Sequence, residues 1–214
     1  MKRITLLLFS VFCTLQLSAT NSDIGRINNF NSDWKFHLGE VSGFMSSNFD
    51  DKSWRMLELP HDWSIEGDFE QSNPAGESGG YLPNGIGCYR KTFKLPQDLK
   101  GKRISIRFDG VYMNSTVYIN GIYLGNRPYG FSSFEYDLTP HLKYGDQKNV
   151  IAVKVDHSLQ PSCRWYTGSG INRSVYLLVK PQQHFRSNGI FFKTEGISGN
   201  TAKVKIDFDI TSHN

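Results

Sequence analysis

The sequence predicts an all-β fold, namely an antiparallel β-sandwich of the jelly-roll type. Three observations support this prediction. Apolar residues alternate with polar ones in several short runs, which places every second side chain on one face of a strand. Turn clusters that contain glycine separate the runs, and no stretch keeps helical periodicity over three turns. The 214 residues are enough for one good-sized all-β domain.

The predicted strands follow one another through the middle of the chain. Their alternating cores lie at residues 89–95, 104–108, 117–119, 122–124, 151–155 and 175–179. Asn120 and Gly121 stand between two of these runs and predict a tight hairpin, because both residues tolerate positive φ. One short helical turn is expected at residues 139–142, with Thr139 as its cap and Pro140 at its first position.

A long loop is predicted from Leu57 to Gly87. Prolines and glycines interrupt it, yet its density of aromatic side chains argues against disorder and indicates a functional loop folded over the sandwich. The adjacent His61 and Asp62 suggest proton chemistry, but neighbours in sequence rarely share a productive geometry. A structural role is therefore preferred, with Asp62 bonding loop amides and Trp63 anchored beneath them.

A domain boundary is predicted near Lys180 and Pro181. After it, the apolar residues at every second position of residues 202–210 alternate with charged ones. This pattern predicts a long amphipathic strand, one face of which needs a partner sheet. The expected division is a jelly-roll domain at residues 21–181 and the start of a second, incomplete sandwich at residues 182–214.

Residues 1–20 have the features of a signal peptide. A short basic segment at residues 1–3 precedes an apolar run at residues 4–17, and small residues at positions 18–20 suit a cleavage site. Export to the periplasm or beyond is expected. The apolar run is shorter than the ~20 residues that span a bilayer, so no membrane-spanning helix is predicted.

Composition argues against two classes of function. The formal net charge is +4, and it falls to +2 (4 − 2) without the leader's Lys2 and Arg3, which does not favour a nucleic-acid partner. Without Cys13 of the leader, Cys88 and Cys163 remain; their pairing cannot be decided from sequence, and two buried free thiols are preferred. No metal-ligand spacing is present, so neither a metal nor another cofactor is predicted.

Several sequence blocks together resemble one enzyme family. They include LPHDWSIE at residues 59–66, GCYRKTF at residues 87–93, FDGV at residues 108–111 and RWYTGSGINR at residues 164–173. In this order, with the spacing between them, the blocks resemble the amino-terminal part of glycoside hydrolase family 2. The resemblance covers residues 34–179.

The resemblance implies a galactose-binding-domain-like jelly roll, then an immunoglobulin-like sandwich that begins in residues 182–214, and a catalytic TIM barrel. Family members are β-galactosidases, β-glucuronidases and β-mannosidases, and this chain looks most similar to the β-galactosidases. They act by a retaining mechanism with two glutamates carried by the barrel. No glutamate of this chain matches those motifs, so no catalytic residue is assigned and the chain alone is expected to be inactive.

Three residues are candidates for binding substrate through the resemblance. Asn84 matches an asparagine that contributes to the galactose subsite in some members, although Asn84-Gly85 also suits a simple turn. Arg164 stands where some relatives have aspartate; it either bonds sugar hydroxyls, pairs with a barrel carboxylate or braces its own loop. Trp165 either stacks on a sugar face or packs at the barrel interface.

The implied function is that of a non-catalytic sugar-binding domain in an exported, β-galactosidase-like enzyme. Its expected partners are a β-linked glycan or galactoside and the catalytic barrel, and a homo-oligomer stays possible. Two alternatives remain open: a free-standing, lectin-like carbohydrate-binding module, and a purely structural interface domain. The unpartnered amphipathic strand at residues 202–210 favours the first reading over the lectin.

Overall fold

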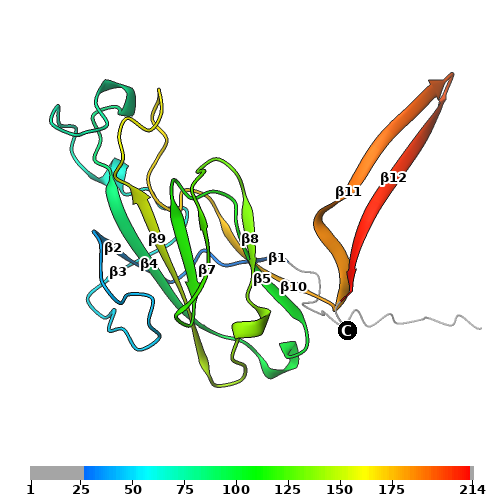
Figure 1. The fold of residues 1–214 in the computed structure, drawn as a ribbon, viewed down its shortest axis with the longest axis horizontal. Coiled ribbons are helices and arrows are strands. Elements are labelled where there is room, and N and C mark those ends of the chain that lie inside the picture. The colour runs from blue at the N-terminus through cyan, green and yellow to red at the C-terminus, as the bar shows by residue number, and fades with distance from the viewer. Residues whose placement is uncertain (1–26, 213–214) are drawn as a thin grey trace, which may run out of the picture.

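The computed structural model describes residues 27–212, and within them the chain forms a β-sandwich followed by a separate hairpin (Figure 1). The predicted all-β sandwich is therefore confirmed. One sheet has the strand order β1-β10-β5-β8, and the other has the order β3-β2-β4-β9-β6-β7. The predicted signal peptide at residues 1–20 lies outside the described residues.

Every neighbouring pair of strands in the two sheets is antiparallel. The first sheet consists of β1 (Ile27–Asn29), β10 (Val175–Lys180), β5 (Arg103–Phe108) and β8 (Phe134–Asp137). The second consists of β3 (Arg55–Leu57), β2 (Trp34–Leu38), β4 (Gly85–Lys94), β9 (Lys148–His157), β6 (Ser115–Ile119) and β7 (Ile122–Arg127).

The core lies between the two sheets and follows the predicted alternation. On β5 the inward residues Ile104, Ile106 and Phe108 are all fully buried, and on β9 so are Ile151 and Val153. Burial of each such side chain contributes about 1.5–3 kcal/mol to folding. On β5 the intervening Ser105 and Arg107 lie on the opposite face, where they bond Glu135 and Asp109, so the alternation decides which face of this strand enters the core.

The Asn120-Gly121 hairpin is confirmed. Both residues have positive φ, 52° and 86°, and they connect β6 to β7. The expected helical turn forms as a short 3-10 helix, Thr139–His141, with Pro140 near its start, but Thr139 does not cap it. The hydroxyl of Thr139 instead accepts a hydrogen bond from Ile104 N at 2.9 Å, because the turn packs against the start of β5.

The long loop is shorter than predicted at both ends. Leu57 belongs to β3, and residues 85–87 open β4. The start of β4 was not predicted because glycines interrupt the alternating pattern there. Gly87 packs directly against Trp63 and Phe36, where a Cβ atom would approach Trp63 within 2.6 Å. The connecting segment, residues 58–84, contains two short 3-10 helices, Ser64–Glu66 and Glu77–Gly79.

A buried ion pair fastens the segment of residues 41–54 over the outer face of the second sheet. Arg90 of β4 is 1% exposed and donates from Nε to Asp51 at 2.8 Å, while Lys35 donates to the same carboxylate at 2.7 Å. Burial opposes ionisation of Asp51, but these two cationic donors lower its pKa. Phe44 and Trp54 then cover the buried thiol of Cys88.

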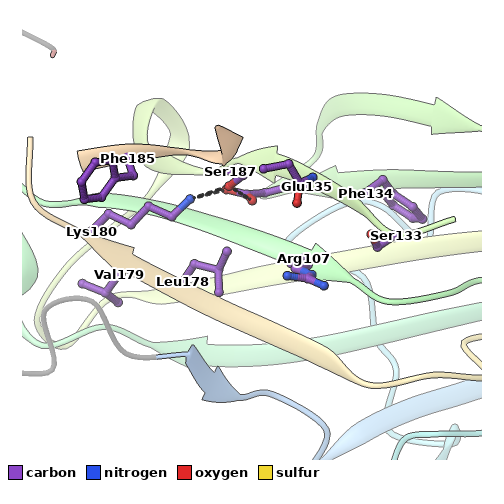
Figure 2. Close-up of a pocket in the computed structure, with 10 residues that line it drawn as sticks. Arg107, Ser133, Phe134, Glu135, Leu178, Val179, Lys180, Phe185 and Ser187 are labelled. Carbon is purple, nitrogen blue, oxygen red and sulfur yellow. Dashed lines mark hydrogen bonds and ion pairs between the residues drawn. The ribbon is translucent and has the colours of Figure 1, made fainter. Parts of the chain in front are cut away.

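The remaining strands, β11 (Gln183–Ser198) and β12 (Thr201–Ser212), form a long two-stranded hairpin that extends away from the sandwich (Figure 1). The predicted amphipathic strand is confirmed as β12. Figure 2 shows the junction, where Lys180 and Ser187 approach Glu135. Lys180 lies 3.0 Å and Ser187 Oγ 2.6 Å from its carboxylate oxygens. Burial opposes ionisation of Glu135, yet the donors Ser105, Ser187 and Lys180 lower its pKa.

Candidate functional site

Two loops meet at one end of the sandwich and form the candidate site. The first is residues 58–84, and the second is residues 158–174, which connects β9 to β10 (Figure 1). Backbone hydrogen bonds join them, from His61 N to Ile171 O at 2.9 Å and from Trp63 N to Ser169 O at 3.2 Å. The first loop thus adds a strand-like edge to the second, and both are held in one conformation.

Asp62 is the residue that fastens these loops together. Its Oδ1 accepts hydrogen bonds from Ser64 N at 3.0 Å and from Ser169 N at 2.8 Å, and its Oδ2 accepts one from the hydroxyl of Tyr166. The structural role expected for Asp62 is therefore confirmed, and Trp63 lies beneath it at 2% exposure. Gly168 has φ +79°, a conformation that favours glycine, and a Cβ atom there would lie 3.0 Å from Asp62 Oδ2.

Beneath the loops lies His157, the last residue of β9. It is 6% exposed, and its Nδ1 lies 2.7 Å from Ser169 Oγ. Its Nε2 lies 2.9 Å from Ser162 Oγ and 2.8 Å from Gln160 Nε2. Because an amide nitrogen only donates, Nε2 is the acceptor and Nδ1 carries the proton of the neutral ring. Burial lowers the pKa of His157 to about 4.

Two of the candidate binding residues, Asn84 and Trp165, line the same small cavity. The cavity holds about 20 Å³, the space of about one water molecule. Its other walls include His157, Cys163 and Tyr166. The Nδ2 atom of Asn84 is buried and has no hydrogen-bond partner within residues 27–212. A buried amide without a partner costs roughly 1–3 kcal/mol, so a group that enters this cavity and accepts a hydrogen bond from Asn84 is favoured.

Arg164 and Trp165 form the outer rim of this site. Trp165 is 61% exposed, and Arg164 is exposed as well. Within the described part of the chain, Arg164 makes no hydrogen bond or ion pair, so it does not brace its own loop. The structure therefore brings Asn84 and Trp165 to one cavity, whereas Arg164 is exposed and does not line it.

A second polar cluster is centred on His61. His61 Nδ1 lies 2.8 Å from the Tyr89 hydroxyl, and its Nε2 lies 2.9 Å from Arg55 Nη2 and 3.2 Å from Glu66 Oε1. Arg55 Nη2 also bonds Glu66 at 2.7 Å. Burial lowers the pKa of His61 although Glu66 opposes the shift, and burial raises that of Tyr89. His61 thus has no nucleophile beside it and serves as a neutral bridge.

Sequence reasoning missed several residues of the site, among them His157, Ser64 and Ser169. For His157 a signal was present, because it continues the inward alternation of Val153 and Val155 by one further step. For the two serines no local signal existed. Their hydroxyls meet only in the folded chain, where Ser64 lies between the carbonyl of Pro83 and Ser169 Oγ.

Neither cysteine of the described residues takes part in a disulfide. Cys88 and Cys163 are both free, as preferred from sequence, but only Cys88 is buried and Cys163 is half-buried at the cavity wall. Burial raises the pKa of the Cys88 thiol. Within residues 27–212, no three side chains of the metal-binding types come together, and no helix is long and apolar enough to cross a membrane.

Comparison with known proteins identifies the family to which this chain belongs. The family profile "Glycosyl hydrolases family 2, sugar binding domain" matches residues 28–191. "Beta-galactosidase BoGH2A" of Bacteroides ovatus is 51% identical over 83% of this chain, which is 21% of that protein. "Beta-glucuronidase" of Formosa agariphila is 34% identical over 85% of this chain and 21% of its own length.

A solved structure agrees with these sequence relatives. The crystal structure of a beta-glycosidase from Bacteroides vulgatus matches with a TM-score of 0.85 and 49% identity. The match covers 89% of this chain and 25% of that one. The chain therefore spans about a fifth of the length of these curated relatives, and the similarity concerns that part only.

Proposed function

The chain belongs to the sugar binding domain of glycosyl hydrolase family 2, and from this premise we propose that it forms one wall of a β-galactoside-binding site. In this proposal Asn84 bonds sugar hydroxyls, Trp165 stacks on an apolar ring face, and Arg164 supplies donors at the rim. The name of the relative from Bacteroides ovatus supports galactose as the sugar.

The observation that supports this proposal best is the unpartnered amide of Asn84. Its Nδ2 is buried at the wall of the cavity that Trp165 also lines. An amide both donates and accepts, which suits neighbouring sugar hydroxyls, and a flat indole suits the C–H face of a pyranose. Asn31, Asn120 and Asn149, by contrast, each have hydrogen-bond partners within the sandwich.

The chain contributes binding rather than bond cleavage in this proposal. Retaining hydrolysis needs two carboxyl groups about 5–5.5 Å apart, one acting as acid/base and one as nucleophile. Asp62 and Glu66 are the carboxylates of the loops' polar contacts: Asp62 is engaged by Ser64, Ser169 and Tyr166, and Glu66 is engaged by Arg55. We place the catalytic glutamates on a barrel that packs against the two loops, with residues 182–214 beginning an intervening immunoglobulin-like sandwich.

Export forms a further part of the proposal. The basic start, the apolar run of residues 4–17 and the small residues at positions 18–20 support a cleaved signal peptide. Mass spectrometry of the protein recovered from an expressing cell should give an amino terminus close to residue 21, and a protein that retains Met1 in the cytoplasm would contradict export.

Substitution of Asn84 tests the binding role. In the enzyme that carries this chain, Asn84→Ala is expected to lower kcat/KM for a nitrophenyl β-galactoside about tenfold or more, because a donor and an acceptor to the sugar are lost. Asn48→Ala is the matched control, since Asn48 is exposed on the loop of residues 41–54. Unchanged kinetics of the Asn84→Ala enzyme would contradict the role.

Assays of the isolated chain test whether it only contributes to sugar binding or also cleaves glycosidic bonds. The purified 214-residue protein is expected to release no nitrophenol from aryl β-galactosides and to bind free galactose weakly or not at all, because only one wall of the site is present. Measurable turnover would overturn the non-catalytic role. Calorimetric binding in the low micromolar range would instead favour the lectin-like module.

A further inference from the structure

A second cleft lies next to the Asn84 cavity, with Pro83 in the wall of both. It has a volume of about 410 Å³, and its walls include Phe36, His37, Leu38, Arg55, Trp63 and Glu66. This volume falls within the range of small-molecule sites, about 300–1,000 Å³. We name it the Arg55 cleft. It is formed by β2, the start of β3 and the short helix of residues 64–66, so all its walls belong to this chain.

The polar groups of the Arg55 cleft keep free hydrogen-bonding capacity. Arg55 uses only Nη2 for its bonds to Glu66 and His61, which leaves the Nε and Nη1 donors without a partner among the described residues. Glu66 Oε2 accepts the bond from Arg55, while Oε1 lies 3.2 Å from His61 Nε2, which receives the Arg55 donor and has no proton to give. Both Glu66 oxygens therefore retain lone pairs for a ligand. Donors and acceptors thus lie side by side, which is the pattern that vicinal hydroxyls require.

The charges within the Arg55 cleft balance. The guanidinium of Arg55 and the carboxylate of Glu66 form an ion pair at 2.7 Å. Between them, the buried imidazole of His61 bridges Arg55 and Tyr89 as a neutral ring. A cleft without net charge gives no advantage to an anionic ligand over a neutral one. The ligand chemistry that fits is therefore uncharged and rich in hydroxyl groups.

Apolar surface accompanies these polar groups. The Arg55 guanidinium carbon lies 5.5 Å from the centre of the Phe36 ring, and Leu38 is 55% exposed at the cleft wall. Trp63, which is 2% exposed, also lines the cleft, and its indole N–H is buried with no hydrogen-bond partner among residues 27–212. A pyranose, apolar on its faces and hydroxylated at its edges, matches such a mixed lining.

Pro83 connects this cleft to the Asn84 site. It lines both the Arg55 cleft and the Asn84 cavity, and its carbonyl oxygen accepts a hydrogen bond from Ser64. We propose that the Arg55 cleft is a second saccharide subsite, which holds a neutral sugar unit of a longer glycan on the far side of Pro83. This inference rests on the proposed function of the Asn84 site for its choice of ligand.

A titration of the whole chain with lactose tests the inference. Lactose at millimolar concentrations is expected to shift the NMR signals of His37, Leu38 and Arg55 saturably. Leu38→Glu is expected to weaken this binding at least about tenfold, because it places a charge against the apolar sugar face. Met56→Glu is the matched control, since Met56 is 64% exposed on β3 and does not line the cleft; its binding should change less than about twofold.

The outcomes separate this inference from the proposed function. Absence of saturable shifts, equal binding by Leu38→Glu and the unaltered chain, or tighter binding of glucuronate than of lactose would each overturn the second subsite. None of these results bears on Asn84→Ala in the enzyme. Conversely, unchanged kinetics of Asn84→Ala together with lactose binding at Arg55 would remove the first role and leave the cleft as a saccharide site in its own right.

Discussion

The sandwich and the β11–β12 hairpin both have strands in which apolar and polar residues alternate, but the apolar side chains are buried in the sandwich and exposed in the hairpin. On β5, the alternating residues Ile104, Ile106 and Phe108 are 0% exposed. On β12, the alternating residues Ile206 and Phe208 are 55% and 58% exposed. Alternation therefore predicts the strand and the face that is apolar, but burial requires a second layer opposite that face.

The two regions also differ in how their strands are stabilised. In the sandwich, every inner face meets another sheet, and the loops at its end are joined by buried polar contacts such as that of Asp62 with Ser169. In the hairpin, cross-strand neighbours such as Phe192 and Ile206 contact mainly each other. Such pairs contribute only about 0.2–1 kcal/mol each, so most of the stability of the chain resides in the sandwich.

The largest expected difference between the two regions comes from a matched pair of truncations. Ile106→Ala should lower the free energy of unfolding by about 2–5 kcal/mol, because it leaves a cavity between two sheets. Ile206→Ala should change it by less than about 0.5 kcal/mol, since its side chain is exposed. Urea unfolding followed by tryptophan fluorescence measures both. Equal losses would show that the hairpin face is buried in solution.

Acidification should reveal a further difference, located in the sandwich. The pKa of His157 is about 4 in the folded chain, below its unfolded value of 6.5, so unfolding takes up a proton between these values. The contribution of neutral His157 to the free energy of unfolding is therefore fully present above pH 6.5. It is lost as the pH drops toward 4, which lowers the free energy of unfolding by about 1–3 kcal/mol. The carboxylates with lowered pKa, Asp51 and Glu135, contribute below that window, as the pH falls below their ordinary values.

The variant that tests this assignment is His157→Gln. A glutamine does not titrate, so the slope of unfolding free energy between pH 6.5 and 4.5 should become smaller. His61, whose pKa is also lowered by burial, accounts for the slope that remains. Chemical unfolding at half-unit steps of pH measures the slope. An identical slope in the variant would show that another group takes up the proton.

The junction between the two regions offers a smaller effect. Ser187→Ala removes the hydroxyl that lies 2.6 Å from Glu135, which should cost about 0.5–1.5 kcal/mol locally. Amide hydrogen exchange in β11 should become faster while exchange in β4 stays unchanged. Ser198→Ala at the far end of β11 is the control. Faster exchange throughout the sandwich would mean that the hairpin is part of its cooperative unit.

The smallest expected effect on stability comes from charging the exposed apolar face of the hairpin. Phe192→Lys should leave the unfolding midpoint unchanged and reduce concentration-dependent self-association, because it interrupts a contiguous apolar surface. Phe191→Lys adds the same charge to the opposite face and is the control. Sedimentation velocity at several concentrations measures the association, and equal behaviour of the two variants would contradict a role for that face.

Part of the candidate site could be predicted from the sequence. The anchoring role of Asp62 followed from its position before a buried tryptophan in a loop rich in turn residues, and Asn84 and Trp165 were proposed through the family resemblance. The contact between Asp62 and Ser169 could not be predicted, because the two residues are 107 positions apart and no local pattern joins them. The same holds for the cleft at Arg55, which needs β2, β3 and the first loop at once.

By itself, the sequence determined the central strands of the sandwich, the amphipathic strand β12 and the Asn120-Gly121 turn, but not the strands β1, β2, β3 and β8. The physical reason is that side-chain alternation and positive φ are local properties of neighbouring residues. Only the tertiary structure decided which apolar faces became buried, which hydroxyls met His157, and that the Nδ2 of Asn84 stayed without a partner. These depend on distant segments that meet only in the folded chain, where each contact is set by the packing of the whole sandwich.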